Sequence, residues 1–308
     1  MRTKLWIALL ALYIVWGSTY LGIKVAIETI PPFFHAAVRF LASGIILVIW
    51  QRSAGVAMPT RQQWISTAII GNLLLLGGNG LVSWAEQFIP SGIAALIIGS
   101  VPIFLVIGEA LRPGGVKPNW QAILGIVIGF IGIYVLVGPS KEAGMALNVF
   151  GVIALLSACV LWTMGSIYSK NADLPKSVLM STGAQMLMGS IGLFIVSALT
   201  GELVSWDASA VSARSIYGVL YLIFIGSLIG FVAYGWLLQN APISLVATYA
   251  YVNPIVAVLL GYWFGNEALE PRIWLATAII VGSVMFINSK SKPRGGKEAK
   301  EVVLENGQ

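Results

Sequence analysis

The chain has 308 residues, of which 58% are hydrophobic and only 10% are charged, whereas about a quarter of the residues in soluble domains are charged. Water therefore cannot be the main solvent of this fold. The net charge of +6 does not indicate a nucleic-acid partner, and we expect none, because the basic residues stand singly between apolar stretches or gather near the C-terminus.

Apolar stretches long enough to form membrane-spanning helices recur along almost the whole chain. About 20 helical residues cross a hydrocarbon core of about 30 Å. In chain order, the expected helices cover residues 5–27, 33–51, 65–86, 92–111, 119–138, 147–168, 177–200, 215–238, 243–264 and 272–289. The first stretch is too long for the core of a signal peptide, so it counts as a spanning helix. The sequence therefore predicts an all-α polytopic membrane protein with ten transmembrane helices.

The loops between these helices differ in charge. With ten crossings, most of the 18 Lys and Arg residues fall on the same side as the two termini. Because basic loops stay in the cytoplasm, both termini are expected to be cytoplasmic. Residues 290–308 are rich in Lys, Glu and Gly and lack a periodic apolar face, which predicts a disordered cytoplasmic tail. Its first lysines are suited to contact anionic membrane lipid.

The chain contains an internal repeat. A shift of 152 residues places Trp84, Gln87, Pro90, Ala95 and Pro102 on Trp236, Gln239, Pro242, Ala247 and Pro254. Trp16 and Lys24 also share their spacing with Trp162 and Lys170. A five-helix unit that occurs twice must insert in opposite orientations, because an odd number of crossings leaves the chain on the other side. We therefore expect two inverted repeats, residues 1–138 and 147–289, an arrangement typical of alternating-access transporters.

The third expected helix carries a row of polar side chains. Asn72, Asn79, Ser83 and Glu86 lie within one sector of an α-helix, and three nearby glycines allow close packing or local unwinding. One interpretation is that Asn79, Ser83 and Glu86 line a substrate cavity. The other is that the glycines only pack helices and that Glu86 lies at the membrane interface.

Aromatic residues with polar groups occur in both halves. Trp16 and Tyr20 share a face of the first helix, and Tyr234, Tyr249 and Tyr251 cluster in the eighth and ninth helices. Such side chains bind solutes with apolar or cationic parts, so Trp16, Tyr20, Tyr234 and Tyr251 are candidate substrate-binding residues. Aromatic residues also form belts at membrane interfaces, and the sequence leaves both roles open.

Two prolines occupy equivalent positions in the repeats. Pro102 and Pro254 lie inside the fourth and ninth expected helices, where each removes a backbone donor. Paired kinks would let each half bend, so both are candidate gating residues. Asn253, next to Pro254, either binds substrate or repairs the kink.

Two further side chains of the second expected helix are unusual for a membrane span. A charge in hydrocarbon is costly, so Arg39 needs a partner, a cavity or a route to the interface. His35 precedes it by one turn and is the only histidine, and Cys159 is the only cysteine. The sequence therefore predicts no metal site, no internal disulfide and no cofactor.

Six short motifs carry a resemblance to a known family: Trp16-Gly-Ser-Thr-Tyr20, Pro31-Pro32, Arg39-Phe-Leu-Ala42, Gly78-Asn-Gly80, Pro90-Ser-Gly-Ile-Ala-Ala95 and Tyr249-Ala-Tyr-Val-Asn-Pro254. Through them the chain resembles the EamA family of the drug/metabolite transporter superfamily, in particular its bacterial inner-membrane members. The resemblance implies two EamA repeats of five helices and a central cavity lined mainly by the first four helices of each half. It also implies ATP-independent transport of small metabolites, without indicating the substrate or the coupling ion.

Together these features predict a secondary transporter that binds a small solute, such as an amino acid or an amphipathic metabolite, between its halves. Export is favoured over import by analogy with the family, and Glu86 is the first acidic candidate for proton coupling. A passive channel or a structural membrane subunit is the alternative. An enzyme or an ATP-driven pump is disfavoured, because the sequence has no HExxH motif and no phosphate-binding loop. The Gly125-x-x-x-Gly129 motif suits helix packing and leaves a homodimer open.

Overall fold

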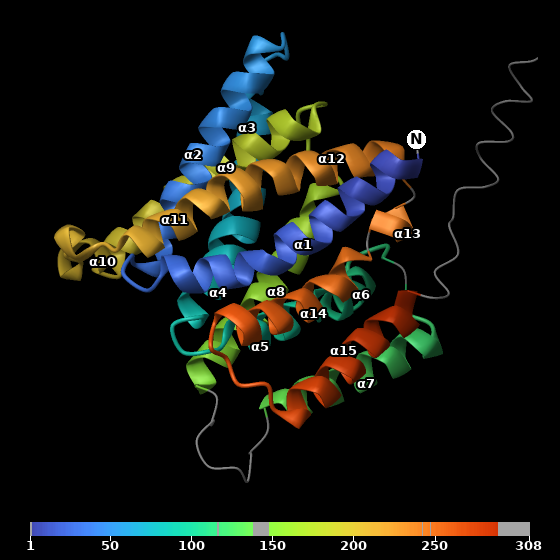
Figure 1. Ribbon diagram of the computed structural model, residues 1–308. Helices are drawn as coiled ribbons and strands as arrows, with labels where there is room; N and C mark the ends of the chain where they lie inside the picture. The colour runs from blue at the N-terminus through green and yellow to red at the C-terminus, as the bar shows by residue number, and fades with distance from the viewer. Residues whose placement is uncertain (1, 116, 138–147, 242, 247, 289–308) are drawn as a thin grey trace, which may run out of the picture.

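The computed structural model describes residues 2–115, 117–137, 148–241, 243–246 and 248–288, and these residues form helices and connecting loops without any strand (Figure 1). Eight helical segments in this part of the chain are long and apolar enough to cross a membrane, and two shorter apolar helices cover Tyr249–Phe264 and Pro271–Ile287. The all-α polytopic class is therefore confirmed, whereas the count of ten crossings stays a prediction. The predicted tail, residues 290–308, lies outside the described residues, as do Pro242 and Ala247 of the internal repeat.

The helices follow most of the expected segments closely. In the first half they are α1 (Arg2–Ala26), α2 (Pro32–Ser53), α3 (Arg61–Gly71), η1 (Asn72–Gly80), α4 (Leu81–Ala85), α5 (Ser91–Ile98), α6 (Val101–Leu111) and α7 (Trp120–Val137). In the second half they are α8 (Val149–Ser169), α9 (Val178–Leu199), α10 (Glu202–Ser205), η2 (Ala208–Ala210), α11 (Ala213–Tyr221), η3 (Leu222–Ile229), α12 (Gly230–Asn240), α13 (Ile243–Val246), α14 (Tyr249–Phe264) and α15 (Pro271–Asn288). The short helices α10 and η2 lie in a connection for which the apolar pattern predicts no helix.

The third and eighth expected helices each contain a π-helical segment. η1 follows α3 directly, and η3 follows α11 directly. The two segments begin 150 residues apart, at Asn72 and Leu222, so the interruption occupies similar positions in both halves. Because π-helical insertions occur frequently at functional sites, both segments mark places to look for one.

The fourth expected helix, 92–111, corresponds to the single apolar segment Ser91–Leu111, which is interrupted near its middle. Gly99 and Ser100 separate α5 from α6, and Pro102 lies in the first turn of α6. Pro102 has no N–H to donate to the preceding turn. The backbone therefore turns before it, and the Ser100 hydroxyl donates a hydrogen bond to the Ile97 carbonyl (2.5 Å). Pro102 lies where a helix tolerates proline and not at a kink within a helix.

The ninth expected helix, 243–264, is divided as well. The hydroxyl and the amide of Thr248 both donate to the Leu245 carbonyl, at 2.5 and 3.3 Å, so the chain makes a tight turn before α14 begins. Pro254 lies inside α14, as the sequence predicts.

Helices of the two halves pack against each other in pairs (Figure 1). α2 lies along α9, α7 lies along α15, and α5 packs on α14. α1 contacts α11, α12 and α14 of the second half, while α8 contacts η1, α4, α5 and α6 of the first. Exchanging the halves leaves this pattern unchanged, because α1 and α8 each pack on the third and fourth helices of the opposite half. We call the boundary between α1–α7 and α8–α15 the seam.

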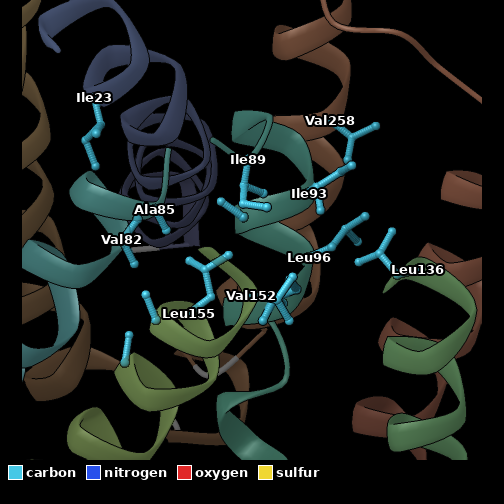
Figure 2. Close-up of a cluster of buried hydrophobic side chains, with 14 of the residues drawn as sticks. Ile23, Val82, Ala85, Ile89, Ile93, Leu96, Leu136, Val152, Leu155 and Val258 are labelled. Carbon is cyan, nitrogen blue, oxygen red and sulfur yellow. The ribbon is translucent and has the colours of Figure 1, made fainter. Parts of the chain in front are cut away.

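Apolar side chains from both halves meet in one large cluster at the seam (Figure 2). Its members include Ile23 of α1, Val82 of α4, Leu96 of α5, Leu155 of α8 and Val258 of α14. Lipid tails are as apolar as these side chains, so close van der Waals packing, and not removal from water, favours this association.

The Gly125-x-x-x-Gly129 motif of α7 faces the inside of the bundle. A Cβ built on Gly125 would contact Ile287 of α15, and one built on Gly129 would contact Ile103 of α6 and Ser283 of α15. The motif therefore packs helices within one chain. A homodimer stays a prediction, but it no longer draws support from these glycines.

Candidate functional site

Four aromatic rings meet around Trp16 of α1. Its indole contacts Phe231, Tyr234 and Tyr249, with ring centroids 5.3, 5.2 and 5.0 Å away. Phe231 and Tyr234 belong to α12 and Tyr249 belongs to α14, so the cluster joins the two halves across the seam. We call these four residues the aromatic cluster. Aromatic faces bind apolar groups by packing and cations by electrostatic attraction, which suits an amphipathic solute.

Tyr20 and Glu86 lie in the same part of the seam. Tyr20, one turn after Trp16 on α1, packs against the apolar cluster that contains Val82 and Ala85 of α4. Glu86 follows α4 and is fully buried, and neither carboxyl oxygen has a hydrogen-bond partner among the described residues. The Nζ of Lys24 donates to the backbone carbonyl of Glu86 (2.9 Å). A carboxylate that accepts no hydrogen bond is costly to bury, so this group is suited to bind a proton or a cation.

Part of the predicted polar row of the third helix lies in η1, which contains Asn72 and Asn79. Asn79 donates to the Leu74 carbonyl (3.4 Å), and the Ser83 hydroxyl donates to the Asn79 carbonyl (2.9 Å), so both side chains bond to their own helix. Asn72 packs against Gly192 of α9, where a glycine Cβ would contact its side-chain oxygen. The wider π-helical turn changes the angle between successive residues. Spacing taken from an α-helix therefore does not apply to this stretch, and the common face of the row stays a prediction.

Tyr251 and Asn253 lie on α14 but outside the aromatic cluster. Tyr251 packs with the apolar cluster between α6 and α15, so the structure does not bring it to Trp16. Asn253 is buried, and its amide nitrogen, oriented toward them, donates to the carbonyls of Tyr249 (3.1 Å) and Tyr13 (3.2 Å). The Asn253 side chain therefore links α14 to α1 beside Pro254.

The break in the fourth span lies against the repeat-related proline. A Cβ built on Gly99, between α5 and α6, would be 2.8 Å from Cγ of Pro254. Pro102 follows in the first turn of α6. Both candidate gating residues are thus close to the place where α5 packs on α14, and their role in gating stays a prediction.

Two glutamates of the second half cap helices of the first half, at the end of the bundle opposite the termini. The carboxylate of Glu202 accepts hydrogen bonds in the first turn of α2, and that of Glu267 accepts them in the first turn of α5. The amide donors are Phe33 (3.1 Å) and Phe34 (3.0 Å) for Glu202, and Ser91 (2.6 Å) and Gly92 (3.0 Å) for Glu267. Helix N-termini favour negative charge, so these caps hold the halves together at that end.

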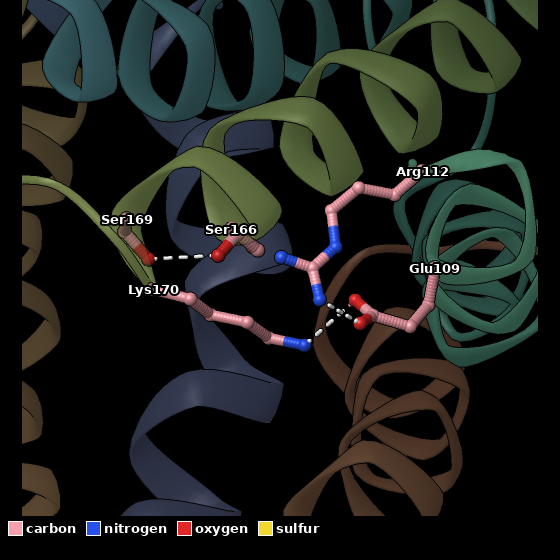
Figure 3. A network of polar contacts seen from close by, with 5 residues as sticks. All are labelled: Glu109, Arg112, Ser166, Ser169 and Lys170. Carbon is pink, nitrogen blue, oxygen red and sulfur yellow. Dashed lines mark hydrogen bonds and ion pairs between the residues drawn. The ribbon is translucent and has the colours of Figure 1, made fainter. Parts of the chain in front are cut away.

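Glu109 joins the halves at the end that carries the termini (Figure 3). Its carboxylate receives hydrogen bonds from Arg112 (2.7 Å), one turn further along the chain, and from Lys170 (2.9 Å), at the end of α8. The hydroxyl of Ser169 donates to the Ser166 carbonyl beside this network (2.8 Å). Lys170 is 54% exposed, so the bridge adds little stability. The bridge instead fixes the position of the halves, because it connects α6 of one half to α8 of the other.

Two hollows lie beside the seam. One of about 430 Å³ is lined by Glu28, Trp84 and Trp206 at the end opposite the termini. The other, of about 570 Å³, is lined by Ser18 of α1 and Tyr221 of α11, whose hydroxyls are 2.5 Å apart. Neither is lined by Trp16 or Glu86, so these two predicted residues lie inside the packed seam.

Several residues at the seam escaped prediction as site residues. Phe231 looks like an ordinary apolar residue of a membrane span, and only its ring contact with Trp16 reveals its place. Tyr249 was passed over in favour of Tyr251, although it completes the aromatic cluster. Glu202 and Glu267 lie outside the expected helices, and no local pattern reveals that each caps a helix of the other half. Among the described residues, no group of three acidic, His or Cys side chains could hold a metal ion.

Long apolar helices whose two halves meet around buried polar and aromatic side chains define a multi-pass membrane protein of the transporter class. The chain belongs to the EamA-like transporter family, whose family model matches residues 3–138 and again residues 149–289. The family resemblance carried by the sequence motifs is thereby confirmed.

Individual relatives match nearly the whole chain. The inner membrane transporter YedA of Escherichia coli (strain K12), described as uncharacterized, is 39% identical over 281 residues, which make up 91% of this chain and 89% of YedA. The uncharacterized transporter YvbV of Bacillus subtilis (strain 168) is 24% identical over 94% of this chain and 93% of its own. A protein crystal structure with 20% identity and a TM-score of 0.62 covers 93% of this chain and 96% of its own, and shows a shared fold. These similarities support a membrane transporter without identifying its solute.

Proposed function

We propose that the protein is a secondary transporter that carries a small solute across the bacterial plasma membrane by alternating access. In this proposal ten helices cross the membrane as two inverted repeats, residues 1–138 and 147–289, with both termini in the cytoplasm. The solute binds at the seam, and export is favoured over import by analogy with the family.

The observation that carries this proposal is that each half makes the same helix contacts with the other half. α1 and α8 each pack on the third and fourth helices of the opposite half, and both third helices contain a π-helical segment. Two similar halves can adopt a second arrangement in which their roles are exchanged, at a similar free energy. Alternating access requires two such states, each open to one side of the membrane.

In this proposal the aromatic cluster packs the apolar part of the solute, and Tyr20 and Glu86 supply the polar part of the site. Glu86 takes up a proton when the solute moves, because its buried carboxyl has no donor in the described structure. Asn79, Ser83, Tyr251 and Asn253 are bonded or packed elsewhere. They contact the solute only if the halves move, and their role stays a prediction.

Counterflow in proteoliposomes tests the transporter proposal. Vesicles that contain the purified protein are loaded with a mixed pool of unlabelled amino acids and small metabolites, and entry of each labelled counterpart is followed. A carrier gives saturable entry that depends on the internal pool. Entry that ignores the internal pool would identify a channel, and no entry by a folded protein across a broad panel would favour a structural subunit.

Two substitutions in α1 localise the site in the same assay. Trp16→Ala removes the centre of the aromatic cluster and should lower counterflow strongly. Trp6→Ala is the matched control, because Trp6 lies on the same helix and is 54% exposed. Equal rates for the two variants would move the site away from the aromatic cluster.

A further inference from the structure

A buried arginine crosses the seam without an acidic partner. Arg39 of α2 is only 4% exposed, and its Nε donates a hydrogen bond to the Ser227 hydroxyl in η3 of the second half (3.0 Å). No ion pair in the described part of the chain includes Arg39. Buried charges are normally paired, and ionisable side chains within a membrane mark functional sites.

The guanidinium of Arg39 is held on one edge only. Ser227 occupies the Nε, the Phe40 ring lies 4.8 Å from Cζ, and a Cβ built on Gly226 would be 3.4 Å from an Nη nitrogen. The group therefore lies against the backbone of η3, within van der Waals contact of a Cβ at Gly226. Neither Nη nitrogen donates a hydrogen bond to another described residue, so their N–H groups are available to a ligand.

A second buried polar group lies one turn away on the same helix. His35 is 1% exposed, and its ring nitrogens make no hydrogen bond of normal geometry within the described residues, although the carbonyls of Pro31 and Pro32 lie near the ring. It precedes Arg39 by four residues in α2, so the two side chains lie on the same face of that helix. The carboxylate of Glu202 caps the start of α2, but its oxygens are engaged by the amides of that turn and by the Ser197 hydroxyl (2.8 Å).

We propose that Arg39 binds an oxyanion of the transported solute, with His35 as a second donor, when the halves part between α2 and η3. The proposal rests on the transporter function and specifies its substrate class, a small solute with a carboxylate or a phosphate monoester. The planar fork of arginine matches two oxygens of either group, which the single ammonium of lysine cannot do. Ser227 keeps the guanidinium in place while no anion is bound.

Competition for counterflow by matched compounds tests this site. The probes are 3-phenylpropionate against 3-phenylpropionamide, and phenethyl phosphate against phenethyl alcohol, because each pair shares a skeleton and differs in its oxyanion. We expect an anion to compete at least about tenfold better than its neutral counterpart. Preference for the carboxylate alone or the phosphate alone supports the site and identifies the oxyanion. Equal competition within both pairs would overturn it.

Substitutions then assign the preference to Arg39. Arg39→Gln should abolish it, and Arg39→Lys should retain the charge but lose most of the preference. Arg214→Gln is the control, because Arg214 is 61% exposed at the surface and should leave the preference unchanged. If Arg39→Gln does not fold, Arg39→Lys and His35→Gln decide the question. An undiminished preference in the folded variants would remove Arg39 from the site.

A binding measurement separates this inference from the transport proposal. Thermal unfolding of the purified protein is followed with each of the four probes. Stabilisation by an anion but not by its neutral counterpart, lost in Arg39→Lys, supports the site even if counterflow is absent and the transporter proposal fails. If counterflow occurs but anions neither stabilise the protein nor compete better than their neutral counterparts, the transporter proposal stands and the oxyanion site is overturned.

Discussion

Trp162 of α8 fills the space that Gly78 leaves open in η1, since a Cβ built on Gly78 would lie 2.5 Å from Cε3 of the indole. The repeat-related residues form the same contact in reverse. Trp16 of α1 lies against Gly230, the first residue of α12 directly after η3, with Cδ1 of its indole 2.8 Å from a Cβ built there. The first helix of each half thus packs a tryptophan against a glycine of the other half's third helix, within η1 in one case and directly after η3 in the other.

Alanine at these glycines should therefore destabilise the seam. Gly78→Ala and Gly230→Ala each place a methyl group within an indole contact, at a cost of about 1–3 kcal/mol. Gly282→Ala is the matched control, because a Cβ at this helical glycine would meet nothing within 4 Å. Thermal unfolding in detergent should show lower midpoints for the first two variants alone. A midpoint for Gly78→Ala equal to that of Gly282→Ala would contradict the contact.

Loss of the Glu86 charge should uncouple transport from the proton gradient. The carboxyl is fully buried and has no donor among the described residues, so Glu86→Gln keeps its shape and removes the group that can take up a proton. We expect counterflow to continue while uptake driven by an imposed pH gradient is lost.

Glu28→Gln is the control for that experiment. Glu28 is 38% exposed and forms only a 3.4 Å pair with exposed Arg214, so its loss should change neither transport mode. Gradient dependence that persists in Glu86→Gln would exclude Glu86 from coupling.

Removal of a cross-half cap should open the end of the bundle opposite the termini. Glu267→Gln replaces a charged acceptor at the start of α5 by a neutral one, which costs about 1 kcal/mol. The fully buried Ser91, whose amide donates to Glu267 (2.6 Å), reports the opening. In a Cys159→Ser background, Ser91→Cys should react faster with a membrane-impermeant thiol reagent once Glu267→Gln is added.

Glu270→Gln is a matched control from the same loop. Glu270 pairs with Arg272 (2.7 Å) and not with a helix of the first half, so its loss should leave the labelling of residue 91 unchanged. Labelling that rises equally in both variants would reflect general loosening of the loop and would contradict a specific cap.

How much of the structure the sequence predicts depends on how far apart in the chain the interacting residues lie. Hydropathy depends on local composition, so it locates most spans to within a few residues. Pro102 adds what hydropathy lacks, because the missing N–H follows from the residue type and indicates the interruption between α5 and α6. The polar row through Asn79 stays a prediction, since the α-helical spacing on which it rests does not apply within a π-helical segment. Glu267 could not be assigned at all, because its partner amides lie 175 and 176 residues away in the chain.

The bridge between Glu109 and Lys170 should act in the opposite sense to the Glu267 cap. Both join the halves, but at opposite ends of the bundle, so Lys170→Gln should favour the state open at the end that carries the termini. An exposed pair contributes about 0.5–1 kcal/mol, which changes a two-state population roughly two- to fivefold. Arg112→Gln is the control, because Arg112 pairs with Glu109 within one half.

Combining Lys170→Gln with Glu267→Gln should bring the labelling at residue 91 back toward its starting rate, since the two changes bias one equilibrium in opposite directions. Labelling that stays as fast as in Glu267→Gln alone would show that the two ends open independently, which a rocking motion of rigid halves does not permit.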